Sequence, residues 1–265
     1  KWHLLPYAGN RNYDFLWQRV QKMSCMLATD IASLCKKLRL SRNLAENAMR
    51  LEANTHQEYL LRLLELEIER RENIRRDKLL KNAGFYTIKT FANYVFDEIT
   101  LPSSINVDYL KNLEFLETKT NLVLYGNVGT GKTHLATALG VEACSRGIET
   151  KFFRTAALVN KLSEAKKSGH LSSFIKKLTK AELIILDEWG YVPLDRTGAQ
   201  LLFELIAECY ERKSLIITTN IEFSRWVNVL YDEQMTGAIL DRLLHHCHLL
   251  LFTGTSYRMK EANLF

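Results

Sequence analysis

A glycine-rich stretch, residues 126–133, carries the strongest chemical signal in the chain. Its sequence, GNVGTGKT, fits the phosphate-binding pattern GxxxxGK[ST], with an apolar strand pattern before it and a helical pattern after it. Glycines let backbone N–H groups approach phosphate oxygens, and the start of the following helix adds positive potential. We therefore expect a nucleotide site, with Lys132 at the β- and γ-phosphates and Thr133 on Mg²⁺. The residues expected to contact nucleotide are Gly126, Asn127, Val128, Gly129, Thr130, Gly131, Lys132, Thr133 and His134.

Two acidic residues, Asp187 and Glu188, end a second apolar run, residues 183–186. Ligands bind at the carboxyl edge of open α/β sheets, so both carboxylates are expected near the nucleotide. Asp187 is expected to hold Mg²⁺ through its water shell, and Glu188 to orient and polarise the attacking water. A third apolar strand ends in Asn220, whose amide can hydrogen-bond the γ-phosphate or the lytic water. An ordinary strand-end cap is the alternative for Asn220.

Residues 154–180 form a basic tract in which Glu164 is the single acid. Positive charge on adjacent helices is typical of phosphate binding, and few side chains here could read base edges. We expect contacts with the DNA backbone and little sequence specificity, with a solvated helix face as the alternative. The candidate DNA-binding residues are Arg154, Lys161, Lys166, Lys167, Lys176 and Lys177.

The elements that position these residues begin at Asn121, where short apolar runs start to alternate with amphipathic helical stretches. This alternation predicts an α/β fold with a parallel central sheet for residues 121–265. Residues 26–95 show helical spacing and predict a small all-helical N-terminal domain, followed by a linker at 96–120. Residues 1–25 show no clear periodicity and are either a genuine arm or an upstream extension of the reading frame.

Composition limits the class of protein further. The chain has 265 residues, of which 47% are hydrophobic and 25% charged, so a disordered chain is excluded. Five widely spaced cysteines favour a reduced, cytoplasmic protein without a disulfide scaffold, and we expect neither a secretion signal nor a membrane span. The net charge of +6 suggests a polyanionic partner. The HHCH run at 245–248 is too tightly spaced for the usual metal-ligand pairs, so we expect a closing strand rather than a metal site there.

Taken in order, GNVGTGKT, LIILDE and IITTN resemble the AAA+ ATPases of the initiator and loader branch. The match is closer to the IstB family, the ATP-dependent helpers of IstA-type transposases. The segments FFRTAALVNKL, AELIILDEWGYVPLD, AILDRLLHHCH and SYRMKE are similar to that family. The resemblance extends from about Leu27 to the C-terminus. It implies a three-layer P-loop AAA+ sandwich, with ATP and Mg²⁺ as cofactors.

The resemblance also implies residue roles. Asn220 would be the sensor on its strand, and Arg242 would be an arginine finger that reaches the γ-phosphate of a neighbouring subunit in a homo-oligomer. Read without the family, Arg242 is equally an ion-pair partner of Asp241. Arg258 would be a sensor in its own subunit, and a helix in the basic tract would face a central pore and grip DNA.

The function expected from this resemblance is an ATP-dependent, DNA-binding helper of an IstA-type transposase. ATP binding would drive assembly on duplex DNA for target selection or remodelling, and hydrolysis would reset the complex. The helical N-terminal domain would dock the partner protein or add DNA contacts. One alternative is a replicative helicase loader similar to DnaC, acting on single-stranded DNA. Another is a small-molecule kinase, against which the Asp187–Glu188 pair and the basic tract argue.

Overall fold

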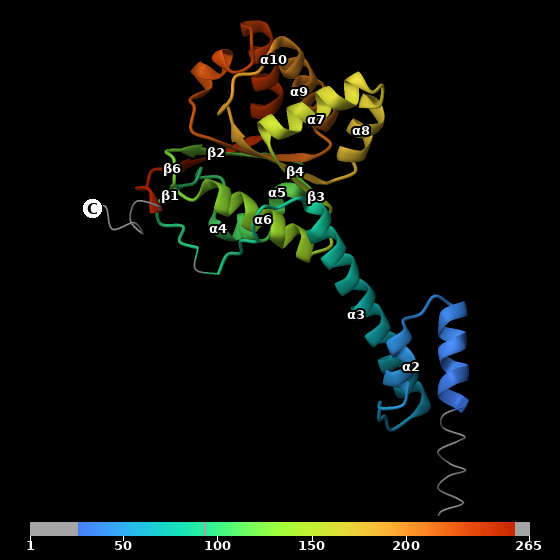
Figure 1. The fold of residues 1–265 in the computed structure, drawn as a ribbon. Helices are drawn as coiled ribbons and strands as arrows, with labels where there is room; N and C mark the ends of the chain where they lie inside the picture. The colour runs from blue at the N-terminus through green and yellow to red at the C-terminus, as the bar shows by residue number, and fades with distance from the viewer. Residues whose placement is uncertain (1–25, 93, 258–265) are drawn as a thin grey trace, which may run out of the picture. The chain divides into compact units, whose positions relative to one another are not determined.

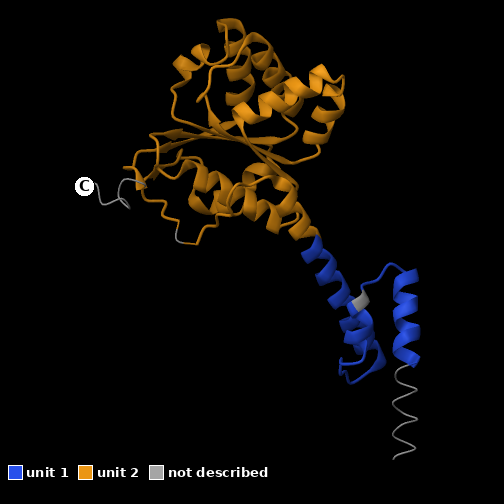
Figure 2. Ribbon diagram, in the orientation of Figure 1, with its two compact units in different colours: residues 1–74 blue, residues 75–265 orange. Residues whose placement is uncertain are grey.

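The computed structural model of the chain describes residues 26–92 and 94–257. The described residues divide into two compact units, one ending at Ile74 and the other starting at Arg75 (Figure 2). The first unit is helical and contains a helix over residues 26–37, α2 (Arg42–Ala48) and the first part of α3 (His56–Ala83). The predicted helical N-terminal region is therefore confirmed. Residues 1–25, for which the sequence leaves a genuine arm and an upstream extension of the reading frame open, lie outside the described residues.

Glu67, a buried acid on α3, ties this helix to the start of α2. Its carboxylate accepts hydrogen bonds from the Ser41 backbone N–H at 3.1 Å and from Arg71 Nε at 2.8 Å. Burial raises the pKa of Glu67, but the hydrogen bonds from Ser41 and Arg71 outweigh it and leave this pKa below its usual value. Arg71 also donates to the Arg39 carbonyl at 2.7 Å. The buried carboxylate is thus ionised and fixes the turn between the helices.

The second unit is built on a six-stranded sheet in the order β1-β6-β2-β5-β4-β3. Five of these strands run parallel, and β1 pairs antiparallel with β6. The strands are β1 (Ile99–Thr100), β2 (Asn121–Gly126), β3 (Thr150–Arg154), β4 (Leu183–Trp189), β5 (Ser214–Thr219) and β6 (Cys247–Phe252). Because β2 lies between β6 and β5, its carboxyl end is at the centre of the sheet edge where ligands bind.

Helices cover both faces of this sheet (Figure 1). One layer contains α4 (Val107–Lys111), α5 (Glu114–Glu117) and α6 (Lys132–Ser145). The other contains α7 (Thr155–Lys167), α8 (Leu171–Leu178), α9 (Arg196–Cys209) and α10 (Glu233–Leu244). A short 3₁₀ helix, η1 (Phe223–Asn228), precedes α10. The predicted three-layer α/β sandwich with a central parallel sheet is confirmed.

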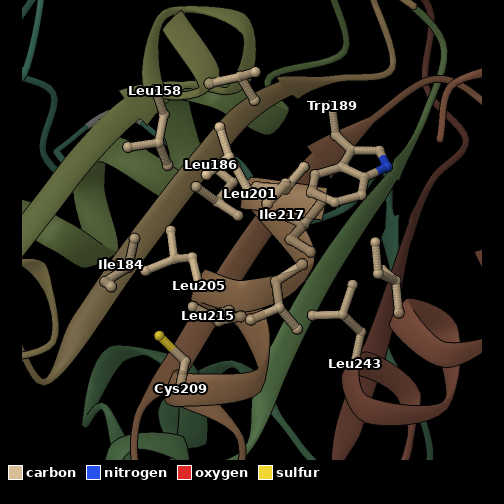
Figure 3. Packing of buried hydrophobic residues seen from close by; sticks show 14 of the residues in the cluster. Leu158, Ile184, Leu186, Trp189, Leu201, Leu205, Cys209, Leu215, Ile217 and Leu243 are labelled. Carbon is tan, nitrogen blue, oxygen red and sulfur yellow. The ribbon is translucent and has the colours of Figure 1, made fainter. Parts of the chain in front are cut away.

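Two apolar cores hold the layers together, because successive residues of each strand point to opposite faces. On β4, Ile184 and Leu186 pack toward α7, α9 and α10, where Trp189 is also fully buried (Figure 3). The intervening Leu183 and Ile185 pack with α6 on the other face. Strands buried on both sides must be apolar throughout, which explains the unbroken apolar runs in the sequence.

The segment 96–120, expected as a linker, is part of the sandwich. It contains β1, α4 and α5, and it buries Leu110, Leu113 and Phe115 in the core next to α6. These helices have only five and four residues, too short to show a helical period in the sequence. Within the described ranges 26–92 and 94–257, no helix is long and apolar enough to cross a membrane.

Candidate nucleotide-binding site

The glycine-rich loop connects the end of β2 to the start of α6, as the sequence predicts. Gly129 and Gly131 have φ angles of 81° and 93°, a left-handed conformation that residues with side chains seldom adopt. Lys132 Nζ donates to the carbonyl oxygens of Gly126 and Asn127 at 2.8 and 2.6 Å, which places the ammonium over the loop. The loop and the helix start therefore offer N–H groups and one cation to a polyphosphate.

Asp187 lies beside this loop and is 3% exposed. Its Oδ1 accepts hydrogen bonds from the hydroxyls of Thr133, at 2.9 Å, and Thr218. A buried carboxylate next to a hydroxyl is an oxygen-rich donor set that suits a hard divalent cation such as Mg²⁺. The predicted metal residues, Thr133 and Asp187, are thus brought together and fit that ion.

A bulge between β4 and β5 positions both acids. Leu186 pairs with Ile217 and Trp189 pairs with Thr219, so Asp187 and Glu188 together oppose a single residue, Thr218. Glu188 takes up the extra length with a φ of 56°, and its N–H donates to Thr218 Oγ1 at 3.1 Å. Bulges re-aim side chains at sheet edges, and here two consecutive acids are presented at the ligand-binding edge.

Glu188 is ion-paired with Arg154, the last residue of the neighbouring strand β3. Glu188 Oε2 lies 3.3 Å from Arg154 Nε. The guanidinium also lies over the ring of Tyr86, 4.5 Å from its centre. Arg154, predicted only as a DNA-binding residue, therefore contacts the candidate nucleotide site through Glu188.

A small cleft lies between the loop and the ends of β4 and β5. As the sequence predicts, Asn220 and Glu188 line this cleft together with residues of the loop. Tyr191 lines it as well. The lining residues of the cleft are Val128, Gly129, Lys132, Thr133, Glu188, Tyr191, Thr218, Thr219 and Asn220. Asn220 follows β5 directly and is exposed.

A second cleft on the other side of the loop includes residues that the sequence analysis missed. Thr87, Lys89 and Tyr257 line it with residues 129–134 and Thr137. Thr87 and Lys89 belong to no recognisable motif, and Tyr257 lies in the SYRMKE segment, where the resemblance assigns a role to Arg258 alone. This cleft widens the candidate site beyond the phosphate-binding loop.

The segment before β1 packs directly on the loop. Tyr94 donates from its hydroxyl to the Gly131 carbonyl at 3.3 Å, and its ring lies 4.9 Å from that of His134. Burial, with a smaller effect of nearby Tyr257, raises the pKa of Tyr94, so its hydroxyl stays neutral and can donate. A ring nitrogen of His134 lies 3.0 Å from the Thr90 carbonyl, and the Tyr257 N–H donates to Gly129 at 3.0 Å. His134, which the sequence predicts to bind nucleotide, is thus in contact with Thr90 and Tyr94 of the same chain.

Arg242 lies on α10 and lines neither cleft. Its Nη1 donates to the Ala238 carbonyl at 2.8 Å, and its guanidinium lies 4.9 Å from the centre of the Phe203 ring. Among the described residues, Arg242 forms no ion pair with Asp241. Arg258, the other predicted sensor, lies outside the described residues.

The lysines of the basic tract are exposed on α7 and α8. Lys166 and Lys167 occupy the last turn of α7, and Lys176 and Lys177 the last turn of α8, whose apolar side is buried through Ile175 and Leu178. Lys161 lies over the Phe153 ring, 5.4 Å from its centre. The described side chains thus form a positively charged outer surface on two adjacent helices.

The strand order, the glycine-rich loop and the paired acids define an ATP-binding protein with the P-loop AAA+ fold. The chain matches the family model for IstB-like ATP-binding proteins over residues 33–264, and it therefore belongs to that family. It is 39% identical to an ATP-binding protein of insertion sequence IS232 from Bacillus thuringiensis subsp. berliner, over 77% of this chain and 82% of the relative. Its identity to the corresponding IS5376 protein of Geobacillus stearothermophilus is 36%, over 82% and 88% of the two chains.

Solved structures are similar at the level of the fold. The structure of DnaA from Aquifex aeolicus with bound AMPPCP matches with a TM-score of 0.50 and 22% identity. The match covers 66% of this chain and 55% of that one.

Proposed function

We propose that the chain is an ATP-hydrolysing, DNA-binding helper of a transposase. In its ATP-bound form it assembles as a homo-oligomer on duplex DNA, where it selects or remodels a target. Hydrolysis then resets the complex. Membership of the IstB-like family and identity with ATP-binding proteins of insertion sequences support the link to transposition.

The observation that carries this proposal is the ion pair between Arg154 and Glu188. Arg154 begins the basic tract directly before α7, and Glu188 follows Asp187 beside the phosphate-binding loop. One guanidinium therefore joins the surface suited to DNA phosphates to the carboxylate suited to activating water. DNA phosphates that attract Arg154 would release Glu188, and this couples DNA binding to ATP hydrolysis.

In the proposed reaction, Glu188 accepts a proton from the water that attacks the γ-phosphorus. The bond between this phosphorus and the β–γ bridging oxygen breaks, and the charge on the leaving ADP is stabilised by Lys132 and the loop N–H groups. Asn220 holds the γ-phosphate or the water through its amide. Thr133 and Asp187 would hold Mg²⁺, which would supply positive charge to the phosphates.

Oligomer assembly rests on Arg242. Its position away from both clefts of its own chain supports a role at the nucleotide of a neighbouring copy. There it would stabilise the γ-phosphate and the charge that develops during transfer. ATP thus acts as the switch, since cleavage removes the contacts that hold Arg242 across the interface.

The helical N-terminal unit is proposed to dock the transposase. It exposes several large apolar side chains on a polar, charged surface, a composition typical of protein interaction sites. These residues are Leu34, Leu38, Leu60, Leu61, Leu64 and Ile68.

The test is binding to matched duplex and single-stranded DNA, with ATP or ADP, at one fixed salt concentration, combined with sizing of the complexes. Tight, ATP-dependent binding to duplex DNA in large assemblies is expected. A preference for single strands would favour the helicase-loader alternative, and no DNA binding with either nucleotide would overturn both DNA-based functions.

A further inference from the structure

A cluster of three potential metal ligands lies on the surface of the second unit, outside the nucleotide site. Glu211 lies in the turn between α9 and β5, and His245 and His246 lie between α10 and β6. Glu211 Oε1 is 3.7 Å from His245 Nδ1 and 3.6 Å from His246 Nε2. One ligand atom from each residue lies within 4.8 Å of the others.

These spacings fit a tetrahedral metal ion. Zn²⁺ binds nitrogen and carboxylate oxygen at about 2.0–2.2 Å, which separates any two ligands of a tetrahedron by roughly 3.3 Å. The two separations from Glu211 exceed this value by only a few tenths of an ångström, and the ligand atoms of the two imidazoles lie within 4.8 Å of each other. All three residues are exposed, so small side-chain rotations can close the difference.

We propose that Glu211, His245 and His246 bind one divalent transition-metal ion of the Zn²⁺ type. Two imidazoles and one carboxylate suit Zn²⁺, Co²⁺ or Ni²⁺, whereas Mg²⁺ prefers an all-oxygen set such as that around Asp187. Three protein ligands leave the fourth position of a tetrahedron to water or to a group from another molecule.

Tyr210 is a hydrogen-bond partner of the proposed metal ligand His245. Its hydroxyl lies 2.8 Å from His245 Nδ1. Glu211 follows Tyr210 directly in the chain. When the metal takes the Nδ1 lone pair, the Tyr210 hydroxyl can donate to the Glu211 carboxylate instead. Such hydrogen bonds to metal ligands fix their orientation.

The location separates this cluster from the nucleotide site. It lies where β5 and β6 begin, at the edge of the sheet opposite the carboxyl ends that bind nucleotide. An ion held there would join the turn after α9 to the end of α10, the helix that carries Arg242. The proposed site would therefore stabilise the junction between the ends of α9 and α10. Among the described residues no disulfide joins these two helices.

The test is a titration of the full chain with Co²⁺, followed by visible absorption, and competition for Zn²⁺ against a chromogenic chelator. Glu211→Gln and His246→Ala are compared with His170→Ala, which removes an exposed histidine elsewhere. Loss of an outer-shell partner alone costs 10–100-fold in metal affinity, so loss of a ligand is expected to weaken binding at least about tenfold. The control should bind as the wild type does.

A second measurement uses only the unchanged protein. Bound Zn²⁺ should protect His245 and His246 from diethylpyrocarbonate, mapped by mass spectrometry, while Mg²⁺ should not. The proposal is overturned if both ligand variants bind Co²⁺ and Zn²⁺ as tightly as the wild type. Equal modification of these histidines with and without Zn²⁺ would also overturn it.

Discussion

Arg154 Nε and Glu188 Oε2 lie 3.3 Å apart, so a residue of the basic tract is ion-paired with the proposed catalytic base. Arg154 is the last residue of β3 and pairs in register with Asp187 on the adjacent strand β4. The bulge after Leu186 turns Glu188, the residue after Asp187, toward the guanidinium. The side chains are 52% and 41% exposed, so water screens the pair and a polyanion can compete for Arg154.

Replacing Arg154 by alanine should therefore raise ATP hydrolysis in the absence of DNA. An exposed ion pair contributes at most about 1 kcal/mol, which limits the increase to roughly fivefold. Added DNA should then stimulate the variant less than the wild type. Steady-state phosphate release with and without duplex DNA measures both effects. Arg212→Ala, which breaks an exposed ion pair with Glu208 outside the basic tract, is the control, and an unchanged or lower basal rate for Arg154→Ala would contradict the coupling.

Glu188→Gln should abolish turnover and leave ATP binding intact. The change removes the proton acceptor, which typically contributes 10²–10⁴-fold, and spares Lys132, Thr133 and Asp187. Nucleotide affinity and ATP-dependent assembly should persist, as measured with a fluorescent ATP analogue and by light scattering. Glu208→Gln, an exposed acid on α9, should hydrolyse ATP normally. Normal hydrolysis by Glu188→Gln would assign the base elsewhere.

The lysines of α7 and α8 should determine how DNA affinity depends on salt. Each contact between a cation and a duplex phosphate contributes about 0.9 to the slope of log K against log salt. Alanine at Lys166, Lys167, Lys176 and Lys177 together should lower the slope by up to about 4. The matched control replaces four exposed lysines outside the tract: Lys36, Lys37, Lys78 and Lys81. If the control set lowers the slope and the first set does not, the N-terminal helices bind the DNA.

Two thiols should be nearly inert in the folded chain. Desolvation raises the pKa of Cys209 and that of Cys247 to about 12, so roughly one molecule in ten thousand carries either thiolate at pH 8. Alkylation at pH 8 with peptide mapping should show slow labelling that becomes fast in denaturant. Because the unfolded thiols lose protons near their ordinary pKa of 9.0, the free energy of unfolding should fall as pH rises from about 9 toward 12. Rapid labelling of the native chain would contradict this.

The sequence predicts the nucleotide loop and the sheet well, because both leave local signals. Glycines precede Lys132 because the backbone of a phosphate-binding loop requires them. The apolar runs are uninterrupted because the strands are buried on both faces. The bulge at Glu188 leaves no such signal, since it depends on how β4 pairs with β5. For the same reason, the pairing of Arg154 with Glu188 could not be predicted from residues that lie far apart in the chain.

Contacts made by irregular segments were missed for a related reason. Tyr94 packs on the phosphate-binding loop from a stretch without helical or strand period, so pattern analysis assigns it no role. Glu211 joins His245 and His246 only because two turns meet at one edge of the sheet. The sequence argument against a metal at the histidine run considered neighbours in the chain alone.

The ends of the sheet affect how the protein behaves at high concentration. An edge strand exposes unpaired N–H and C=O groups to which a second chain can add. Here β1 is only two residues long and is followed closely by Pro102, which has no N–H to donate. The opposite edge, β3, is covered by the end of α3 and the residues after it: Lys151 Nζ donates to the Asn82 carbonyl at 3.0 Å, and the Phe85 ring packs on that of Phe152. Both edges thus disfavour aggregation by strand addition, a property that the proposed assembly of several copies on DNA would require.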